Sequence, residues 1–195
     1  MMENILNHAF SVEVTSLQAT RNLQNPETFQ KAVTLLSDAQ RIGATGCGHS
    51  GICAQHFAHL MCCIEKPARF ISPAEAVHGA MGFLQPGDVL LWFSRGGQTD
   101  ELTKILEICK EKAVTVIGIT EKPASTLGLA SDVVLPVSII AECDKYNSQG
   151  TTSFTVMSVI CDALQAAVIE ATGYRNEQFA LIHPGGAVGK RLNHK

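Results

Sequence analysis

Apolar and polar residues alternate along the chain in blocks that predict a parallel α/β fold. Short apolar runs rich in branched residues occur about five times, and most are followed by longer stretches with apolar residues every three or four positions. These two spacings are typical of buried strands and amphipathic helices, respectively. Because strands that alternate with helices usually lie parallel, the pattern predicts a doubly wound, five-stranded parallel sheet with helices on both faces.

The expected strands lie at residues 42–45, 69–72, 89–94, 114–120 and 133–137, and the expected helices at 50–64, 99–111, 125–130, 151–172 and 176–182. Residues 89–93 are continuously apolar, which is typical of a strand that is covered on both faces. Pro136 lacks an amide donor for the ladder, so it favours an edge position for the last strand.

Residues 1–38 precede the first strand and are predicted to form two helices. In residues 1–23, apolar side chains recur at spacings of three and four, which indicates an amphipathic helix that we expect to pack on a partner subunit. The second helix begins at Asn25-Pro26-Glu27, where Asn can cap, Pro fits the first helical position and Glu favours the positive helix end. We expect residues 1–195 to form one domain, since domains commonly contain roughly 100–200 residues.

Composition and charge narrow the class of protein. Of the 195 residues, 46% are hydrophobic and 17% are charged, which is typical of globular rather than disordered proteins. The net charge is −3 and the cations are scattered along the sequence. We therefore expect no nucleic acid partner, because such a partner favours a concentrated basic face.

The cysteines and the N-terminus favour a cytoplasmic location. The seven cysteines are odd in number, and Cys53, Cys109 and Cys161 are among those within apolar helical runs, which suits buried thiols in a reducing compartment. Residues 1–4 lack the basic and apolar regions of a signal peptide. No uncharged apolar run approaches the ~20 residues that span a bilayer, so we expect no membrane partner.

Two polar, glycine-containing turns follow the first and third expected strands. In a doubly wound sheet, ligands bind beyond the carboxyl ends of the strands, and the amides at a helix start favour an anion. We therefore predict a phosphate site at these turns. Its expected members are Gly48, His49 and Ser50 in the turn at 46–51, and Ser94, Arg95, Gly97, Gln98 and Thr99 in the turn at 94–101.

Simpler interpretations of these segments stay open. The glycines can serve the turn alone, and Arg95 can point to solvent. A third segment, Thr151-Thr152-Ser153, opens a helix, where one hydroxyl suffices as an N-cap but three in a row favour anion contacts. The first turn lacks the third glycine of a dinucleotide fingerprint, so we expect no nicotinamide cofactor.

Four titratable side chains are candidates for proton transfer. Glu101 lies in the first turn of a helix, where it could equally be a helix-dipole partner. Glu142 opens a polar loop after the last strand, a setting in which catalytic groups often occur. His78 lies in a loop before Gly79, and His183 precedes a Pro-Gly-Gly segment.

A metal site is an alternative at the start of the first long helix. His49, Cys53 and His56 fall at positions i, i+4 and i+7, so one helix face could present all three. However, Cys53 is expected to pack on the sheet, and the chain has no Cys-x-x-Cys pair. We therefore predict no metal.

Five motifs together resemble one known family. They are the segments 46–51, 74–79, 94–101, 151–153 and 179–192, the last beginning Phe-Ala-Leu-Ile-His-Pro-Gly-Gly. Over residues 30–193 the chain resembles the sugar isomerase (SIS) domain, and within it the D-arabinose 5-phosphate isomerases of the KpsF/GutQ family. The resemblance implies a flavodoxin-like sheet. Many members also carry CBS regulatory modules, so this chain resembles a single-domain form.

The resemblance implies an aldose–ketose isomerase without a required metal or cofactor. The expected reaction converts D-arabinose 5-phosphate to D-ribulose 5-phosphate through an enediol. The catalytic residues carried over by motif are His78, Glu101, Glu142 and His183, with Glu142 as the enediol base and His183 in ring opening. The family also implies a homotetramer or homodimer whose sites are completed across subunits, with the N-terminal helix and the His183 segment as the exchanged parts.

Three departures from the family pattern keep two alternatives open. His49 stands where the family carries lysine, Arg95-Gly96-Gly97 replaces the middle of a Ser-x-Ser-Gly turn, and Gly150 replaces a proline. A histidine has an unperturbed pKa near ~6.5, so it is not permanently charged as lysine is. The alternatives are a non-catalytic sugar-phosphate sensor and a hexulose-phosphate isomerase of the same fold. His49 favours the sensor, whereas the four retained acid–base candidates favour an enzyme.

Overall fold

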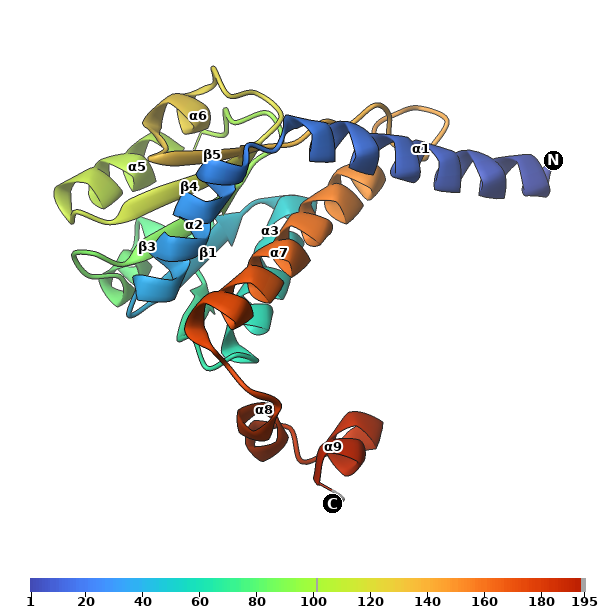
Figure 1. The fold of residues 1–195 in the computed structure, drawn as a ribbon. Coiled ribbons are helices and arrows are strands. Elements are labelled where there is room, and N and C mark those ends of the chain that lie inside the picture. The colour runs from blue at the N-terminus through green and yellow to red at the C-terminus, as the bar shows by residue number, and fades with distance from the viewer. Residues whose placement is uncertain (101, 194–195) are drawn as a thin grey trace.

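A five-stranded, all-parallel sheet forms the centre of the computed structural model, which describes residues 1–100 and 102–193 (Figure 1). The strand order is β2-β1-β3-β4-β5, which is flavodoxin-like. In this order β2 is added on one side of β1, and β3, β4 and β5 are added on the other side, so the switch point lies between β1 and β3. The strands are β1 Ile42–Gly46, β2 Ala68–Phe70, β3 Val89–Phe93, β4 Thr115–Thr120 and β5 Val133–Pro136. The predicted fold class is confirmed, and β5 with its proline lies at an edge as expected.

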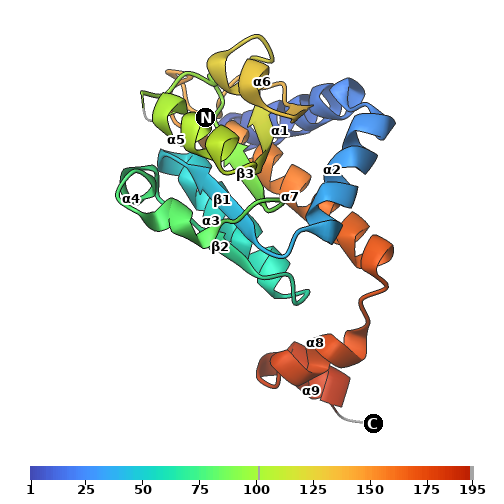
Figure 2. The same ribbon diagram turned by 90° about the vertical axis from the view of Figure 1, so that its left-hand side faces the viewer.

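Helices cover both faces of the sheet (Figures 1 and 2). One face carries α2 Pro26–Asp38, α3 Gly48–Cys62 and α7 Thr151–Thr172, whose buried side chains form a single apolar cluster with the sheet. The other face carries α4 Pro73–Ala76, the 3-10 helix η1 Ala80–Phe83, α5 Leu102–Glu111 and α6 Thr126–Ala130. The remaining helices are α1 Met2–Leu23, α8 Asn176–Ile182 and α9 Gly186–Asn193.

The central strand β3 is apolar at every position because both of its faces are buried. Leu91 and Phe93 pack in the cluster with α2, α3 and α7, whereas Leu90 and Trp92 pack in the cluster with α5 and α6. Successive side chains of a strand point to opposite faces, so a strand between two helical layers needs apolar residues at every position. The expectation of a strand covered on both sides is confirmed.

Helix α1 is amphipathic as predicted, but its apolar side is not buried in this chain. The large side chains of Ile5, Leu6, Phe10 and Val14 are more than half exposed, and the N-terminal half of α1 extends beyond the body (Figure 1). Its buried residues, Ser16 and Thr20, are polar.

These two hydroxyls attach α1 to the segment that follows β5. The Ser16 hydroxyl accepts a hydrogen bond from the Ile140 amide at 3.0 Å, and the Thr20 hydroxyl accepts one from the Ser138 amide at 2.9 Å. Both amides lack a sheet partner because β5 has ended, so buried acceptors from α1 satisfy them.

Helix α7 runs through the core and carries the chain away from the carboxyl edge of the sheet. By length and composition alone, α7 could cross a membrane. Its inner face, including Met157, Cys161 and Leu164, is instead fully buried beside α2 and α3. At about 1.5 Å per residue, its 22 residues span about 33 Å. The helices α8 and α9 therefore lie beyond the far end of α7 (Figures 1 and 2).

Candidate functional site

The first glycine turn and the start of α7 meet at the carboxyl edge of the sheet. Gly48 begins α3 with a φ of 55°, and His49 follows it. A Cβ built on Gly150 would lie 2.5 Å from Nδ1 of His49, so the imidazole packs directly on the residue before α7. The hydroxyl of Ser50 is directed to Sδ of Met157 at 3.9 Å, also on α7. The fold thus brings together two segments that lie about 100 residues apart in the sequence.

The second turn adjoins the first because β3 pairs with β1, with Phe93 opposite Gly46. The Ser94 hydroxyl accepts a hydrogen bond from the Gly97 amide at 3.1 Å and thereby closes the turn. Gly97 has a φ of 64°, and a Cβ there would collide with the Ser125 side chain of the α6 cap. Only glycine fits this position, because it tolerates both the positive φ and the close neighbour.

The same turn presents unpaired backbone donors. Within residues 1–100 and 102–193, the amides of Gly96 and Gln98 have no hydrogen-bond partner. They flank the Gly97 amide, which donates to Ser94, and they precede α5, so both can donate to an anion bound at this turn. Gln98 is exposed and Thr99 is half-buried, so both side chains border the turn.

Arg95 leaves the turn to bridge two carboxylates. Its Nη1 donates to Oε1 of Glu142 at 2.7 Å, and its Nε donates to Oε2 of Glu121 at 2.9 Å. The interpretation of Arg95 as a residue that simply points to solvent is therefore wrong. Its side chain is still 38% exposed, whereas Glu142 is only 2% exposed.

The second carboxylate oxygen of Glu142 occupies the start of α7. Oε2 accepts hydrogen bonds from the Thr151 hydroxyl and from the Ser153 amide, both at 3.2 Å. The Thr152 hydroxyl lies 3.3 Å from Sγ of Cys143 and is fully buried. The helix start predicted to hold a substrate anion thus holds an anionic side chain of the protein itself. An acidic residue there is favoured by the free amides and the helix dipole.

The loop after Glu142 is held by Asp144, a residue that the sequence patterns did not indicate. Its carboxylate accepts the amides of Tyr146, Ser148 and Gln149 at 2.9, 3.0 and 2.9 Å. The hydrogen bond from the Gln149 amide, together with those from the other amides, stabilises the ionised carboxylate. These bonds hold the pKa of Asp144 below its usual value. An Asp followed by several polar residues is a signal for such a side-chain-to-backbone turn.

The remaining acid–base candidates are Glu101, His78 and His183. Glu101 lies outside the described residues. His78 is exposed in the segment between α4 and η1, and no hydrogen bond joins it to Glu142 in the part that the structure describes.

His183 lies at the opposite end of α7 from Glu142. Its ring lies against that of Phe179 in a tilted arrangement, with centroids 4.9 Å apart and an interplanar angle of 38°. His183 also lines a cavity of about 450 Å³ together with Cys63 and Tyr174. Its Nδ1 is buried without a hydrogen-bond partner among the described residues. The 22 residues of α7 separate His183 from Glu142 within the described chain.

No metal site forms among residues 1–100 and 102–193, where no three His, Cys, Asp or Glu side chains are grouped to hold an ion. Cys53 faces α7, with Sγ 3.4 Å from the Ser158 hydroxyl, while His49 packs on Gly150. A hydrogen bond with Cys161 lowers the pKa of Cys53, and burial raises that of Cys161. This thiol pair belongs to the interface between α3 and α7.

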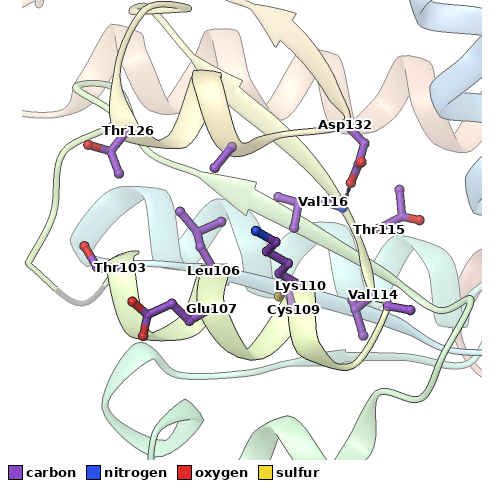
Figure 3. A pocket seen from close by; sticks show the side chains of 12 residues that line it. Thr103, Leu106, Glu107, Cys109, Lys110, Val114, Thr115, Val116, Thr126 and Asp132 are labelled. Atoms are coloured by element: carbon purple, nitrogen blue, oxygen red, sulfur yellow. Dashed lines mark hydrogen bonds between the residues drawn. The ribbon is translucent and has the colours of Figure 1, made fainter.

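A separate groove of about 700 Å³ lies between α5, α6 and the beginning of β4 (Figure 3). Its lining includes Leu106, Lys110, Val116 and Asp132, and none of the predicted site residues. Burial raises the pKa of Cys109, at its base, to about 12. This groove is not at the carboxyl edge that the turns define.

Residues 35–167 match the SIS domain. This chain belongs to the SIS domain family. The SIS chain is 39% identical over 167 residues to the arabinose 5-phosphate isomerase KdsD of Pseudomonas aeruginosa, covering 85% of this chain and 51% of that protein. It is 33% identical to the arabinose 5-phosphate isomerase GutQ of Escherichia coli K12, covering 100% of this chain and 62% of the relative. The SIS chain thus spans about half to three fifths of these curated relatives.

A solved structure matches nearly the whole SIS chain. The protein c3406 of E. coli CFT073, in complex with arabinose 5-phosphate, superimposes with a TM-score of 0.86 at 26% identity. The match covers 94% of this chain and 97% of the other. The fold of this chain is therefore shared by a protein whose structure was solved in complex with arabinose 5-phosphate.

Proposed function

We propose that this SIS domain protein interconverts an aldose phosphate and a ketose phosphate, with D-arabinose 5-phosphate and D-ribulose 5-phosphate as the substrate pair. The observation that carries the proposal is the buried carboxylate of Glu142, which Arg95 of the second turn holds at the carboxyl edge of the sheet. The names of the KdsD and GutQ relatives and the c3406 complex support the same reaction and substrate. We further propose that residues 1–195 act as one SIS domain, with residues 1–38 as N-terminal helices.

The phosphate binds at the turn that contains Ser94, Gly96 and Gln98. The amides of Gly96 and Gln98 lack partners in the described part of the chain, and the following helix adds a favourable dipole. The start of α7 is less suited to the phosphate, because the Thr151 hydroxyl and the Ser153 amide already bind Glu142. Gln98 and Thr99 border the phosphate, and Gly48 and His49 form the opposite wall.

The chemistry needs one base that serves both carbons. The Glu142 carboxylate removes the proton from C2 of the open-chain aldose, and the electrons of that C–H bond form the C1=C2 bond of the enediol. The O1 oxygen gains a proton from an acid in the site. In the second half, O2 loses its proton as C=O forms, and Glu142 returns the proton to C1. No atom or electron is gained, so the reaction needs no redox cofactor.

His49 lies where it can act on the reacting oxygens. It is exposed at the start of α3 and packs on Gly150, one residue from the Thr151 that binds Glu142. A histidine can donate a hydrogen bond in either protonation state, as an oxygen of a developing enediol requires. We propose that His49 lies at the wall of the site nearest to O1 and O2 of the substrate.

We propose that the protein is a homotetramer, built from homodimers, and that subunits complete each other's sites. The exposed apolar side of α1 supports an intersubunit contact, since monomers rarely leave such a stripe uncovered. The position of His183 beyond the far end of α7 supports its use, with His78 and Glu101, in a site shared between chains. We place the protein in the cytoplasm, with a sugar phosphate as ligand and neither nucleic acid nor a membrane as partner. The net charge of −3 supports the absence of a nucleic acid partner.

Isomerisation in ²H₂O, followed by nuclear magnetic resonance, tests the proposed function. D-arabinose 5-phosphate should give D-ribulose 5-phosphate that carries deuterium at C1, because the proton held by Glu142 exchanges with solvent. Saturable binding without conversion or exchange would instead establish the sensor. Conversion of a hexulose 6-phosphate without conversion of the pentose would establish the second alternative.

A further inference from the structure

We propose that Arg95 is the positioning residue for Glu142, and that Glu121 holds Arg95 in this role. The inference rests on the proposed function, because it concerns the base of that reaction. Arg95 is the second residue of the turn that follows β3, and its guanidinium leaves that turn to reach Glu142. Three features support this role: the burial of Glu142, the fixed position of Arg95, and the change of charge during the reaction.

First, the buried carboxylate of Glu142 needs partners that hold it in place. Glu142 lies in the segment 137–150, which contains neither helix nor strand, yet its carboxylate is buried. The Thr151 hydroxyl and the Ser153 amide hold only Oε2. Oε1 is held by Arg95 alone among the described residues, and Arg95 is the only cation that bonds to this carboxylate there. Without that cation, Glu142 would be a buried charge with no counter-charge, which is costly.

The second feature is the fixed position of Arg95. Its carbonyl accepts the Glu121 amide at 3.0 Å and the Thr120 hydroxyl at 3.1 Å, so its backbone is tied to the end of β4. Its Nε is tied to the Glu121 carboxylate, whose other oxygen accepts the Ile139 amide at 3.0 Å. The planar guanidinium bridges two carboxylates from separate nitrogens, which the single ammonium of lysine does not reproduce.

The third feature is the change of charge during the reaction. When Glu142 takes the C2 proton it becomes neutral, and the guanidinium loses one of its two anionic partners. Its positive charge then faces the site as negative charge develops on the enediol oxygens. Preorganised charge of this kind stabilises the transition state without reorganisation. Arg95 therefore supports the base before proton transfer and the intermediate after it.

The test compares kcat and KM for wild type, Arg95→Ala and a matched control, Arg69→Ala, an exposed arginine on β2. We expect kcat of Arg95→Ala to fall about 100-fold with KM little changed, because misplacement of a catalytic group by about 1 Å costs that much. The Arg69→Ala variant should match wild type. Millimolar guanidinium chloride should restore part of the lost kcat in Arg95→Ala only, since the vacated position is open to solvent. Sodium chloride at equal ionic strength should not.

Two conservative variants keep the test decisive if Arg95→Ala does not fold. Arg95→Lys should retain intermediate kcat, and Glu121→Gln should lower kcat without a response to guanidinium. Full kcat in these variants would overturn the role of Arg95. So would a rise in KM alone, which would make Arg95 a phosphate ligand, or a folded Arg95→Ala that guanidinium does not rescue. If the wild type is inactive, the proposed function is wrong and this role of Arg95 with it. If the wild type is active, a failed prediction for the variants contradicts the role of Arg95 alone.

Discussion

The imidazole of His49 packs on the backbone of Gly150, with Nδ1 2.5 Å from the place of a Cβ on that glycine. Both positions are among the three expected departures from the family pattern. These two residues are in contact. The absence of a side chain at Gly150 leaves room for the imidazole beside the start of α7.

Replacing Gly150 by Ala should displace His49 and weaken substrate binding. The new methyl group would overlap the ring, so His49 must leave its present rotamer. We expect the KM for the sugar phosphate to rise about tenfold, which corresponds to roughly 1.4 kcal/mol. Alanine is also a poorer N-cap than glycine, so the free energy of unfolding should fall by about 1 kcal/mol. Steady-state kinetics and denaturant unfolding measure the two effects.

Gly82→Ala is the matched control, because no atom lies within 4 Å of a Cβ at that position. It should leave KM and stability unchanged. If the overlap is the cause, Gly150→Ala should cost less stability in a His49→Ala background than in wild type. Equal costs in both backgrounds would show that His49 and Gly150 are not coupled.

Acidification should loosen the loop that follows Glu142. Three amides stabilise the ionised Asp144, so its pKa is lower in the folded than in the unfolded protein. A depressed carboxyl pKa stabilises the fold above the unfolded value of ~3.9, and this contribution is lost as pH falls through the folded pKa. Hydrogen exchange of the Tyr146, Ser148 and Gln149 amides should therefore gain an acid-induced opening over that range. Asp144→Asn should show faster exchange already at neutral pH; unchanged protection in that variant would contradict the role of Asp144.

A charge on the exposed side of α1 should disrupt the proposed assembly. Phe10 is two-thirds exposed in the single chain, and burial of such a side chain contributes about 1.5–3 kcal/mol. Phe10→Glu should shift the mass measured by light scattering from tetramer toward monomer and reduce kcat, because His183 would no longer reach a neighbouring site. Gln18→Glu adds the same charge at an exposed polar position of α1 and should change neither quantity. A monomeric wild type, or an intact Phe10→Glu tetramer, would contradict the assembly.

Local sequence patterns predicted the sheet because the apolar pattern of each strand depends on which of its own faces are buried. The unbroken apolarity of Leu90 to Phe93 and the proline of β5 each reflect one strand's own surroundings. The convergence of the glycine turns followed from the rule that parallel strands end at one edge. Those features needed no knowledge of distant partners.

The pairings within the site could not be predicted in the same way. Arg95 and Glu142 are 47 residues apart, and nothing near either residue indicates the other. The Thr151 hydroxyl and the Ser153 amide bind Glu142, a partner that the residues of this segment do not indicate. The place of His183 depended on the length of α7, which separates two ends that the motif pattern treats as one site.

The role of Glu142 as the base is tested by ketose formation from D-arabinose 5-phosphate, measured side by side for wild type and Glu142→Gln. The wild type should form D-ribulose 5-phosphate. The variant should fold and bind the aldose phosphate, yet turn over about 10²- to 10⁴-fold more slowly, the usual contribution of a general base. A Glu142→Gln protein with wild-type turnover, or a wild type that binds the sugar phosphate without converting it, would contradict the account.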